Sequence, residues 1–244
     1  MKKILFHTTM LLLLVSCNQN KKLDTESGVL WKIESKSGIE SYIFGTIHLY
    51  PSSEIELTEN VISKLQKCNV LALETDGMYE SDQQKFDDIE TPNSLLDFYR
   101  VIKAEYENEL VNMEGELVKI SKESKMYLTG LESIDEILKI EKENAGIKIP
   151  EKKMTDKQIL DNFQLVLKLY KEESIQKLYK EMTIQYGNKA TKSLVDNRNE
   201  NWVDDIVSLI EKDKTFIAVG VGHLGGKIGI LNLLQKKGYK LKRI

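Results

Sequence analysis

The sequence is poor in cysteine and histidine and has no excess of positive charge. Of its 244 residues only two are cysteines, Cys17 and Cys68, and Cys17 falls in an N-terminal leader. The rest of the chain therefore has a single thiol, which excludes an intramolecular disulfide and disfavours a cysteine-based metal site. The formal net charge is −3, with both signs interspersed. Because no basic face is present, we expect no nucleic-acid partner.

The leader precedes a body with the composition of a globular domain. Lys2 and Lys3 are followed by an apolar stretch centred on residues 10–15, and this stretch ends in Leu14-Val15-Ser16-Cys17. That ending resembles the lipobox of bacterial lipoproteins, which implies that Cys17 is lipidated and becomes the new N-terminus. An ordinary signal peptide or a short membrane anchor is the alternative. The body is 30% charged and 41% hydrophobic, and it contains no second candidate for a membrane span.

These features predict three segments. Residues 1–17 form the lipoprotein signal peptide, residues 18–28 form a polar tether, and residues 29–244 form a single domain. We therefore expect the protein in a bacterial cell envelope, attached to a membrane through its lipid.

The two histidines outside the leader occur in the same local pattern. His48 and His223 each follow a short apolar strand in the sequence Gly-x-x-His-Leu, and the third histidine, His7, lies in the leader. A residue at the carboxyl end of a strand points into the crevice where open α/β sheets bind ligands. One such histidine alone is better explained as a turn or core residue, but the repeat favours a shared site. If both rings hold one ion through nitrogens at ~2.1 Å, their side chains lie within about 7 Å of each other.

Glu74 and Arg198 are two further candidates. Glu74 follows the apolar strand at residues 70–73, and a carboxylate at such a position must be paired, hydrogen-bonded or bound to metal. A helix-capping or salt-bridged carboxylate is the alternative. Arg198 lies one turn before Trp202 on an apolar helical stripe, where it needs an anionic partner. The alternative is an arginine whose stem passes the edge of the core.

Hydrophobic periodicity predicts an α/β fold of mixed α and β elements. We expect a hairpin at residues 29–34 and 41–46, and further strands at 70–73, 126–131, 216–219 and 240–244. Helices are expected at residues 58–67, through much of 94–190, at 194–210 and at 228–237. Residues 77–93 are predicted to be a loop and 148–153 a connector. The architecture that follows is a central mixed sheet, built from the N- and C-terminal segments and flanked by helices, with a mainly helical middle insertion.

Several short sequence segments, taken together, resemble the TraB/GumN family over residues 29–244. They are Leu30-Trp31-Lys32-Ile33, Ile43 to His48, Leu71 to Glu74, Gly130-Leu131-Glu132-Ser133, Arg198-Asn199 with Trp202, Phe216 to Gly226, and Lys237-Gly238-Tyr239. The resemblance implies a relation to the Tiki metalloproteases and, more widely, to erythromycin-esterase-like and haem-binding ChaN-like proteins. It implies that His48 and His223 are metal ligands, that Glu74 is a ligand or general base, and that Glu132, Arg198 and Asn199 line the site.

The leading functional prediction is a lipid-anchored, metal-dependent hydrolase that cleaves a peptide or protein substrate. The resemblance implies manganese or cobalt, and zinc is also compatible with histidine and carboxylate ligands. No His-Glu-x-x-His helix is present, so the site is not that of an ordinary zincin. Two alternatives remain: a metal-free esterase-type hydrolase with one histidine as base, and a non-enzymatic haem- or metal-binding surface lipoprotein or scaffold.

Overall fold

The fold is organised by a six-stranded sheet whose order is β6-β4-β7-β2-β1-β8. The structure is a computed structural model and describes residues 25–75, 93–145 and 154–244. The strands of this sheet are β1 (Leu30–Glu34), β2 (Glu40–Thr46), β4 (Val70–Thr75), β6 (Tyr127–Glu132), β7 (Thr215–Gly220) and β8 (Lys240–Arg243). A second, two-stranded sheet pairs β3 (Leu49–Pro51) with β5 (Leu110–Asn112).

The four strands β6, β4, β7 and β2 run parallel, and this places their carboxyl ends at one edge. β2 pairs with β7 so that Thr46 lies opposite Gly220, and β4 pairs with β6 so that Thr75 lies opposite Glu132. β7 also pairs in parallel with β4. The other two strands are antiparallel, because β1 forms a hairpin with β2 and β8 returns beside β1.

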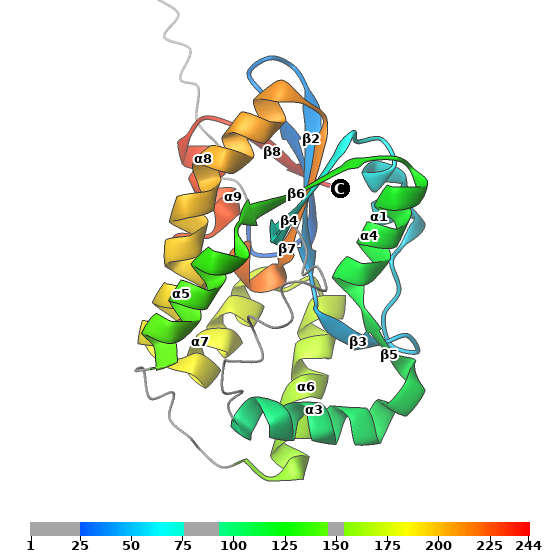
Figure 1. Ribbon diagram of the computed structural model, residues 1–244, viewed down its shortest axis with the longest axis vertical. Coiled ribbons are helices and arrows are strands. Elements are labelled where there is room, and N and C mark those ends of the chain that lie inside the picture. Colours follow the sequence, from blue (N-terminus) through cyan, green and yellow to red (C-terminus); the bar gives the residue numbers. More distant parts are fainter. Residues whose placement is uncertain (1–24, 76–92, 146–153) are drawn as a thin grey trace, which may run out of the picture.

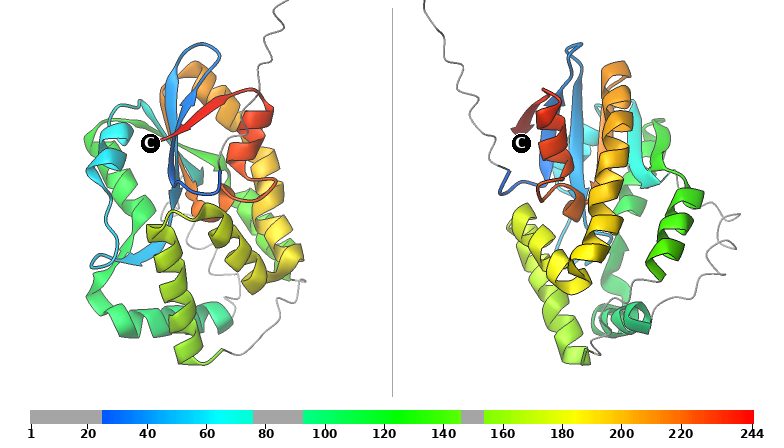
Figure 2. Two further views of the ribbon diagram at one scale, coloured as in Figure 1. Left: turned by 180° about the vertical axis from the view of Figure 1, so that it is seen from behind. Right: turned by 90° about the vertical axis from the view of Figure 1, so that its left-hand side faces the viewer.

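Helices cover both faces of the sheet, and further helices lie beyond the carboxyl ends of its parallel strands (Figures 1 and 2). The helices α1 and α4 lie on one face, while α8 and α9 lie on the other (Figure 1). The helices α3, α6 and α7 lie beyond the carboxyl ends of the parallel strands, at the bottom of Figure 1. Their bounds are α1 (Glu59–Leu65), α3 (Asn93–Tyr106), α4 (Met113–Glu123), α5 (Ile134–Ala145), α6 (Asp156–Lys171), α7 (Ile175–Thr191), α8 (Asn197–Lys212) and α9 (Ile230–Lys236).

The core explains why the central strands are almost continuously apolar. Phe216, Ile217, Ala218 and Val219 of β7 are fully buried, since helices cover both faces of the strand. Phe216 packs against Phe44 of β2 with ring centroids 6.1 Å apart. Because the site residues follow strands fixed by this core, their backbone positions are set by the register of the sheet.

The predicted fold class, a mixed sheet flanked by helices with a mainly helical middle region, is confirmed, with differences in detail. The hairpin forms as expected, and Thr58 caps α1 by accepting a hydrogen bond from the Val61 backbone N–H. The last helix begins at Ile230 rather than 228, because a 3₁₀ turn at Val221–His223 and further turns precede it. The expected helix at 194–210 is instead a π-helical segment, Lys192–Asp196, followed by α8.

Some expected segments lie outside the described residues, namely the leader with Cys17, most of the tether, most of the 77–93 loop and the 148–153 connector. Across the described ranges, no helix combines the length and the apolar character that crossing a membrane requires.

Candidate active site

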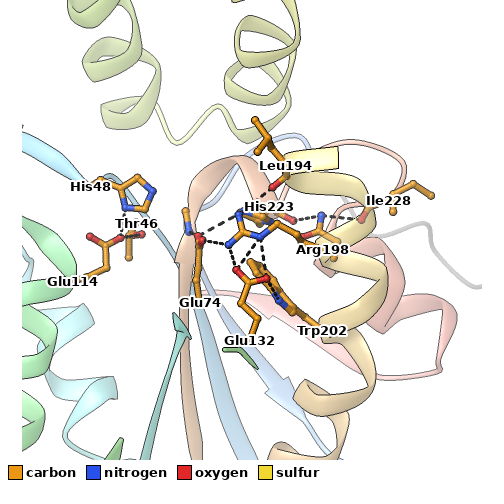
Figure 3. A network of polar contacts seen from close by, with 12 residues as sticks. Thr46, His48, Glu74, Glu114, Glu132, Leu194, Arg198, Trp202, His223 and Ile228 are labelled. Carbon is orange, nitrogen blue, oxygen red and sulfur yellow. Dashed lines mark hydrogen bonds and ion pairs between the residues drawn. The ribbon is translucent and has the colours of Figure 1, made fainter. Parts of the chain in front are cut away.

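Side chains from four strand ends and one helix meet at the carboxyl edge of the parallel strands (Figure 3). His48 follows β2, Glu74 lies near the end of β4, Glu132 ends β6, and His223 follows β7. Arg198 reaches them from α8. The sheet thus gathers residues that are up to 175 positions apart in the chain, as the parallel pairing requires.

His223 is a buried ring whose orientation and tautomer are fixed by Asn199. Nδ1 of the ring lies 2.7 Å from Asn199 Oδ1. The amide nitrogen of Asn199 donates to the backbone oxygens of His223 and Ile228, which leaves only its oxygen to face the ring. Nδ1 therefore carries the proton and Nε2 presents a lone pair. Burial lowers the pKa of His223 to about 4, although Glu74 opposes that shift, so the ring is neutral at physiological pH.

His48 is an exposed ring held by a carboxylate. Its Nδ1 lies 2.9 Å from Glu114 Oε1, and its side chain is 67% exposed. The hydrogen bond to Glu114 raises the pKa of His48 to about 9. As in His223, the δ nitrogen is engaged by a side chain of the protein, and the ε nitrogen is left to face the site.

The two rings converge at Gly220. A Cβ built on this glycine would lie 3.2 Å from Glu74 Oε1, 3.5 Å from His48 Nε2 and 3.7 Å from His223 Cδ2. The nearest atoms of the two rings can therefore be no more than about 7 Å apart, which is within the limit set above for histidines that share one ion. Any larger residue at position 220 would occupy the space that the three side chains surround.

Glu74 divides its two oxygens between the histidines and the arginine. Oε1 accepts the Gly220 backbone N–H at 2.7 Å and lies 3.6 Å from His223 Nε2. Oε2 accepts from Arg198 Nη2 at 2.7 Å. Burial opposes ionisation of this carboxyl, but the neighbouring His223, Arg198 and His48, together with the Gly220 N–H, prevail and hold the pKa of Glu74 at about 2. Glu74 is therefore an anion throughout the physiological range.

Arg198 joins Glu74 to Glu132 across the site. Its Nε donates to Glu132 Oε1 at 3.0 Å, and its Nη2 also contacts that carboxylate. Trp202 Nε1 donates to the other oxygen of Glu132 at 3.1 Å. Burial raises the pKa of Glu132, whose side chain is only 6% exposed. The hydrogen bonds from Arg198 and Trp202 fix the Glu132 carboxylate in place.

The π-helical segment before α8 contributes to the placement of Arg198. In Lys192–Asp196 the backbone N–H of Asn197 bonds to the carbonyl of Lys192, five residues back. The Leu194 carbonyl in this segment accepts a hydrogen bond from Arg198 Nη1 at 3.1 Å. Single π turns inside α-helices occur frequently at functional sites. Here the turn supplies a backbone acceptor that directs the guanidinium.

The side chains around Gly220 fit a divalent ion by their chemistry. Each imidazole has its δ nitrogen held by a second side chain, which is the arrangement usual for metal-ligating histidines. The 3.6 Å between His223 Nε2 and Glu74 Oε1 is close to the ~3.4 Å expected of two donors at ~2.1 Å from one tetrahedral ion. Within the described ranges, however, no three His, Cys, Asp or Glu side chains are already grouped closely enough to hold a metal ion.

A cavity of about 330 Å³ lies beside the Arg198–Glu132 pair. It is bounded by β6, α5 and α8, with Leu131, Ile140 and Trp202 as its apolar lining. Polar and charged groups complete the wall, among them Glu136, Lys139, Asn201 and Asp205. The cavity thus provides space of small-ligand size next to the charged network.

The structure brings together all the site residues expected from the sequence: His48, Glu74, Glu132, Arg198, Asn199 and His223. Arg198 has the anionic partners that its position required, and Glu74 is both ion-paired and close to the histidines. Cys68 is buried and burial raises the pKa of its thiol to about 12, as expected of a packing residue. Sequence reasoning missed Glu114, because it lies in α4, whose only local signal is an acidic first turn after a capping Asn112.

Comparison with known proteins gives one family. The sequence model of the TraB/PrgY/gumN family matches residues 29–96 and 91–243. No curated protein and no solved structure matches the chain.

Proposed function

The chain belongs to the TraB/PrgY/gumN family, and from that premise we propose that it is a metal-dependent hydrolase with peptides or proteins as substrates. The observation that carries the proposal is the convergence of His48 Nε2, the His223 ring and Glu74 Oε1 around Gly220. One carboxylate and two imidazoles make a ligand set that leaves further positions open for water and substrate. His223 is already neutral, and His48 would release its Nε2 proton when it binds the ion.

His48, His223 and Glu74 would hold the ion. When bound, a divalent ion polarises a carbonyl and makes its water a stronger nucleophile. Manganese and cobalt are the first metals to test, and zinc is the third. Asn199 keeps the lone pair of His223 Nε2 directed into the site, and Glu114 anchors the His48 ring.

The other charged residues have separable roles. Arg198 carries a fixed positive charge, and its Nη1 is 3.5 Å from His223 Nε2, so it can stabilise negative charge that develops on a substrate oxygen. Both oxygens of Glu132 are engaged by Arg198 and Trp202. Neither oxygen of Glu132 is therefore free to take a proton, and Glu74, whose Oε1 faces the rings, is kept as a ligand of the ion. The pKa of Glu74 near 2 keeps this carboxylate ionised, as a metal ligand must be.

One observation favours a metal-free hydrolase as the second candidate. Arg198 already places a cation against Glu74 and close to His223, where a guanidinium and a divalent ion repel each other. In that case the base would be His223, which is neutral and whose Nε2 presents a lone pair to the site.

The decisive experiment measures metal content and cleavage in the same preparations. Protein purified without added metal is analysed by mass spectrometry, reconstituted with Mn²⁺, Co²⁺ or Zn²⁺, and assayed on a peptide library with and without chelator. We expect one bound ion, chelator-sensitive cleavage, and loss of the ion in His48→Ala and His223→Ala. Cleavage that survives chelation would support the metal-free candidate, and binding without turnover would support a haem- or metal-binding role.

We also propose that the protein is anchored to a membrane of the cell envelope by lipidation of Cys17, including palmitate. The leader pattern Leu14-Val15-Ser16-Cys17 supports this. In a bacterial host, the full chain is expected to incorporate labelled palmitate and to partition with detergent. Cys17→Ser is expected to lose both properties, whereas Cys68→Ser keeps them. An unlabelled wild-type chain would refute the anchor.

A further inference from the structure

Three successive residues at the N-terminus of α4 contact His48. Asn112 Nδ2 donates to the His48 carbonyl at 3.1 Å, and the Met113 backbone N–H donates to the same oxygen at 3.4 Å. Glu114 then contacts the ring at Nδ1. The short pairing of β3 with β5 sets Leu49 opposite Asn112 and keeps the two segments in register. Both the backbone and the ring of His48 are thus held from one place.

The two oxygens of the Glu114 carboxylate have few other partners. Its Oε1 accepts from Thr46 Oγ1 at 2.5 Å as well as from the ring (Figure 3). Its Oε2 is buried and has no hydrogen-bond partner in the part of the chain that the structure describes. His48 is the one cationic group within hydrogen-bonding distance of this carboxylate among those residues. A partly buried carboxylate with one buried, unpaired oxygen and a single such partner is costly unless that partner stays in place.

We propose that Glu114 is a positioning residue that keeps the proton of His48 on Nδ1 and turns Nε2 toward Gly220 and Glu74. This deepens the proposed function and rests on it. An exposed ring loses rotamer freedom when it is fixed, so it needs a stronger anchor than a buried ring does. A charge-assisted hydrogen bond supplies that anchor. His223, which packing already fixes at 5% exposure, has at Nδ1 the neutral amide of Asn199 instead.

Glu116 provides a matched control on the same turn of α4. It is also a carboxylate in the first turn, and it accepts a hydrogen bond from the Tyr50 hydroxyl rather than from a histidine. Glu114→Gln and Glu116→Gln therefore remove the same charge from the same helix end. Only the first alters the group that faces His48.

The first measurement is the affinity of the full chain for Mn²⁺ by titration calorimetry. We expect Glu114→Gln to weaken binding about 10–100-fold, the range found when partners of ligating histidines are replaced. Glu116→Gln should stay close to wild type. Equal affinities in the two variants, with Mn²⁺ bound by wild type, would overturn the role of Glu114 and leave the proposed function standing.

The second measurement needs no bound metal. It compares several variants, so it does not depend on whether any one of them folds poorly. In ¹⁵N-histidine-labelled protein, the Nδ1 proton of His48 should give a slowly exchanging, downfield resonance, assigned by its absence in His48→Gln. We expect it in wild type, Glu116→Gln and Glu114→Asp, but not in Glu114→Ala. Its persistence in Glu114→Ala would refute the proposal. Wild type that shows the resonance but binds no Mn²⁺ would instead refute the metal function alone.

Discussion

Arg198 donates from Nη2 to Oε2 of Glu74 at 2.7 Å, and this leaves Oε1 of the same carboxylate to face the two histidines. The arginine also pairs with Glu132, so one guanidinium serves two carboxylates that are at least four-fifths buried. Site geometry and stability are therefore linked through a single side chain.

Loss of that side chain should be costly to folding. Arg198→Ala leaves Glu74 and Glu132 without their cation, and breaking buried pairs of this kind costs about 3–5 kcal/mol. Urea unfolding measures the change. Arg100→Ala is the control, because Arg100 is 55% exposed and solvent screens its pairs with Asp97 and Asp156, so we expect a much smaller loss. Similar losses in the two variants would contradict the buried network.

Gly220→Ala should affect the site more than the fold. The added methyl would lie 3.2 Å from Glu74 Oε1 and 3.5 Å from His48 Nε2, in the space where an ion would be held. Overpacking of this kind costs about 1–3 kcal/mol. We expect Mn²⁺ binding to be lost while the unfolding transition remains cooperative. Gly222→Ala is the control, since its methyl would contact the flexible Met182 side chain instead. Unimpaired binding in Gly220→Ala would show that the rings do not converge there.

The His48–Glu114 pair should make stability fall with rising pH in metal-free protein. The folded pKa of His48, about 9, exceeds its ordinary value of 6.5 because of Glu114. Its stabilisation is therefore complete below pH 6.5 and is lost as pH rises through 9. Because the ring is 67% exposed, solvent screening limits the effect to about 1 kcal/mol or less. Unfolding free energies of wild type and Glu114→Gln at pH 6 and pH 9.5 test this, and equal pH dependence in both would contradict it.

Tyr170 of α6 ties the helical insertion to the strand that leads to His48. Its buried hydroxyl donates to the Gly45 carbonyl at 2.8 Å. Tyr170→Phe leaves that carbonyl unpaired, and we expect a loss of about 1–3 kcal/mol in unfolding free energy. Tyr99→Phe, at a 47% exposed position of α3, should change it by less than about 0.5 kcal/mol. Denaturant unfolding of both variants measures these changes. An unchanged unfolding free energy in Tyr170→Phe would mean that water replaces the hydrogen bond.

Sequence by itself determined the parts that depend on local pattern. The apolar runs that become β2, β4 and β7, and the residues that follow them, could be read directly, because buried parallel strands leave a clear signature. The parallel pairing of these strands, which the structure shows, places His48, Glu74 and His223 at one edge of the sheet. The same reading found Arg198, since an arginine on an apolar stripe must meet a carboxylate.

Only the tertiary structure decided which atoms face one another. Glu114 is 66 residues from His48 and enters the site through the docking of α4, for which no local pattern exists. The pairing of Arg198 with both Glu74 and Glu132 depends on a π turn and on packing against β6. Hydrogen bonds need donors and acceptors placed within a few tenths of an ångström. The register of the strands and the packing of the helices fix atomic positions to this precision, whereas hydrophobic periodicity along the chain does not.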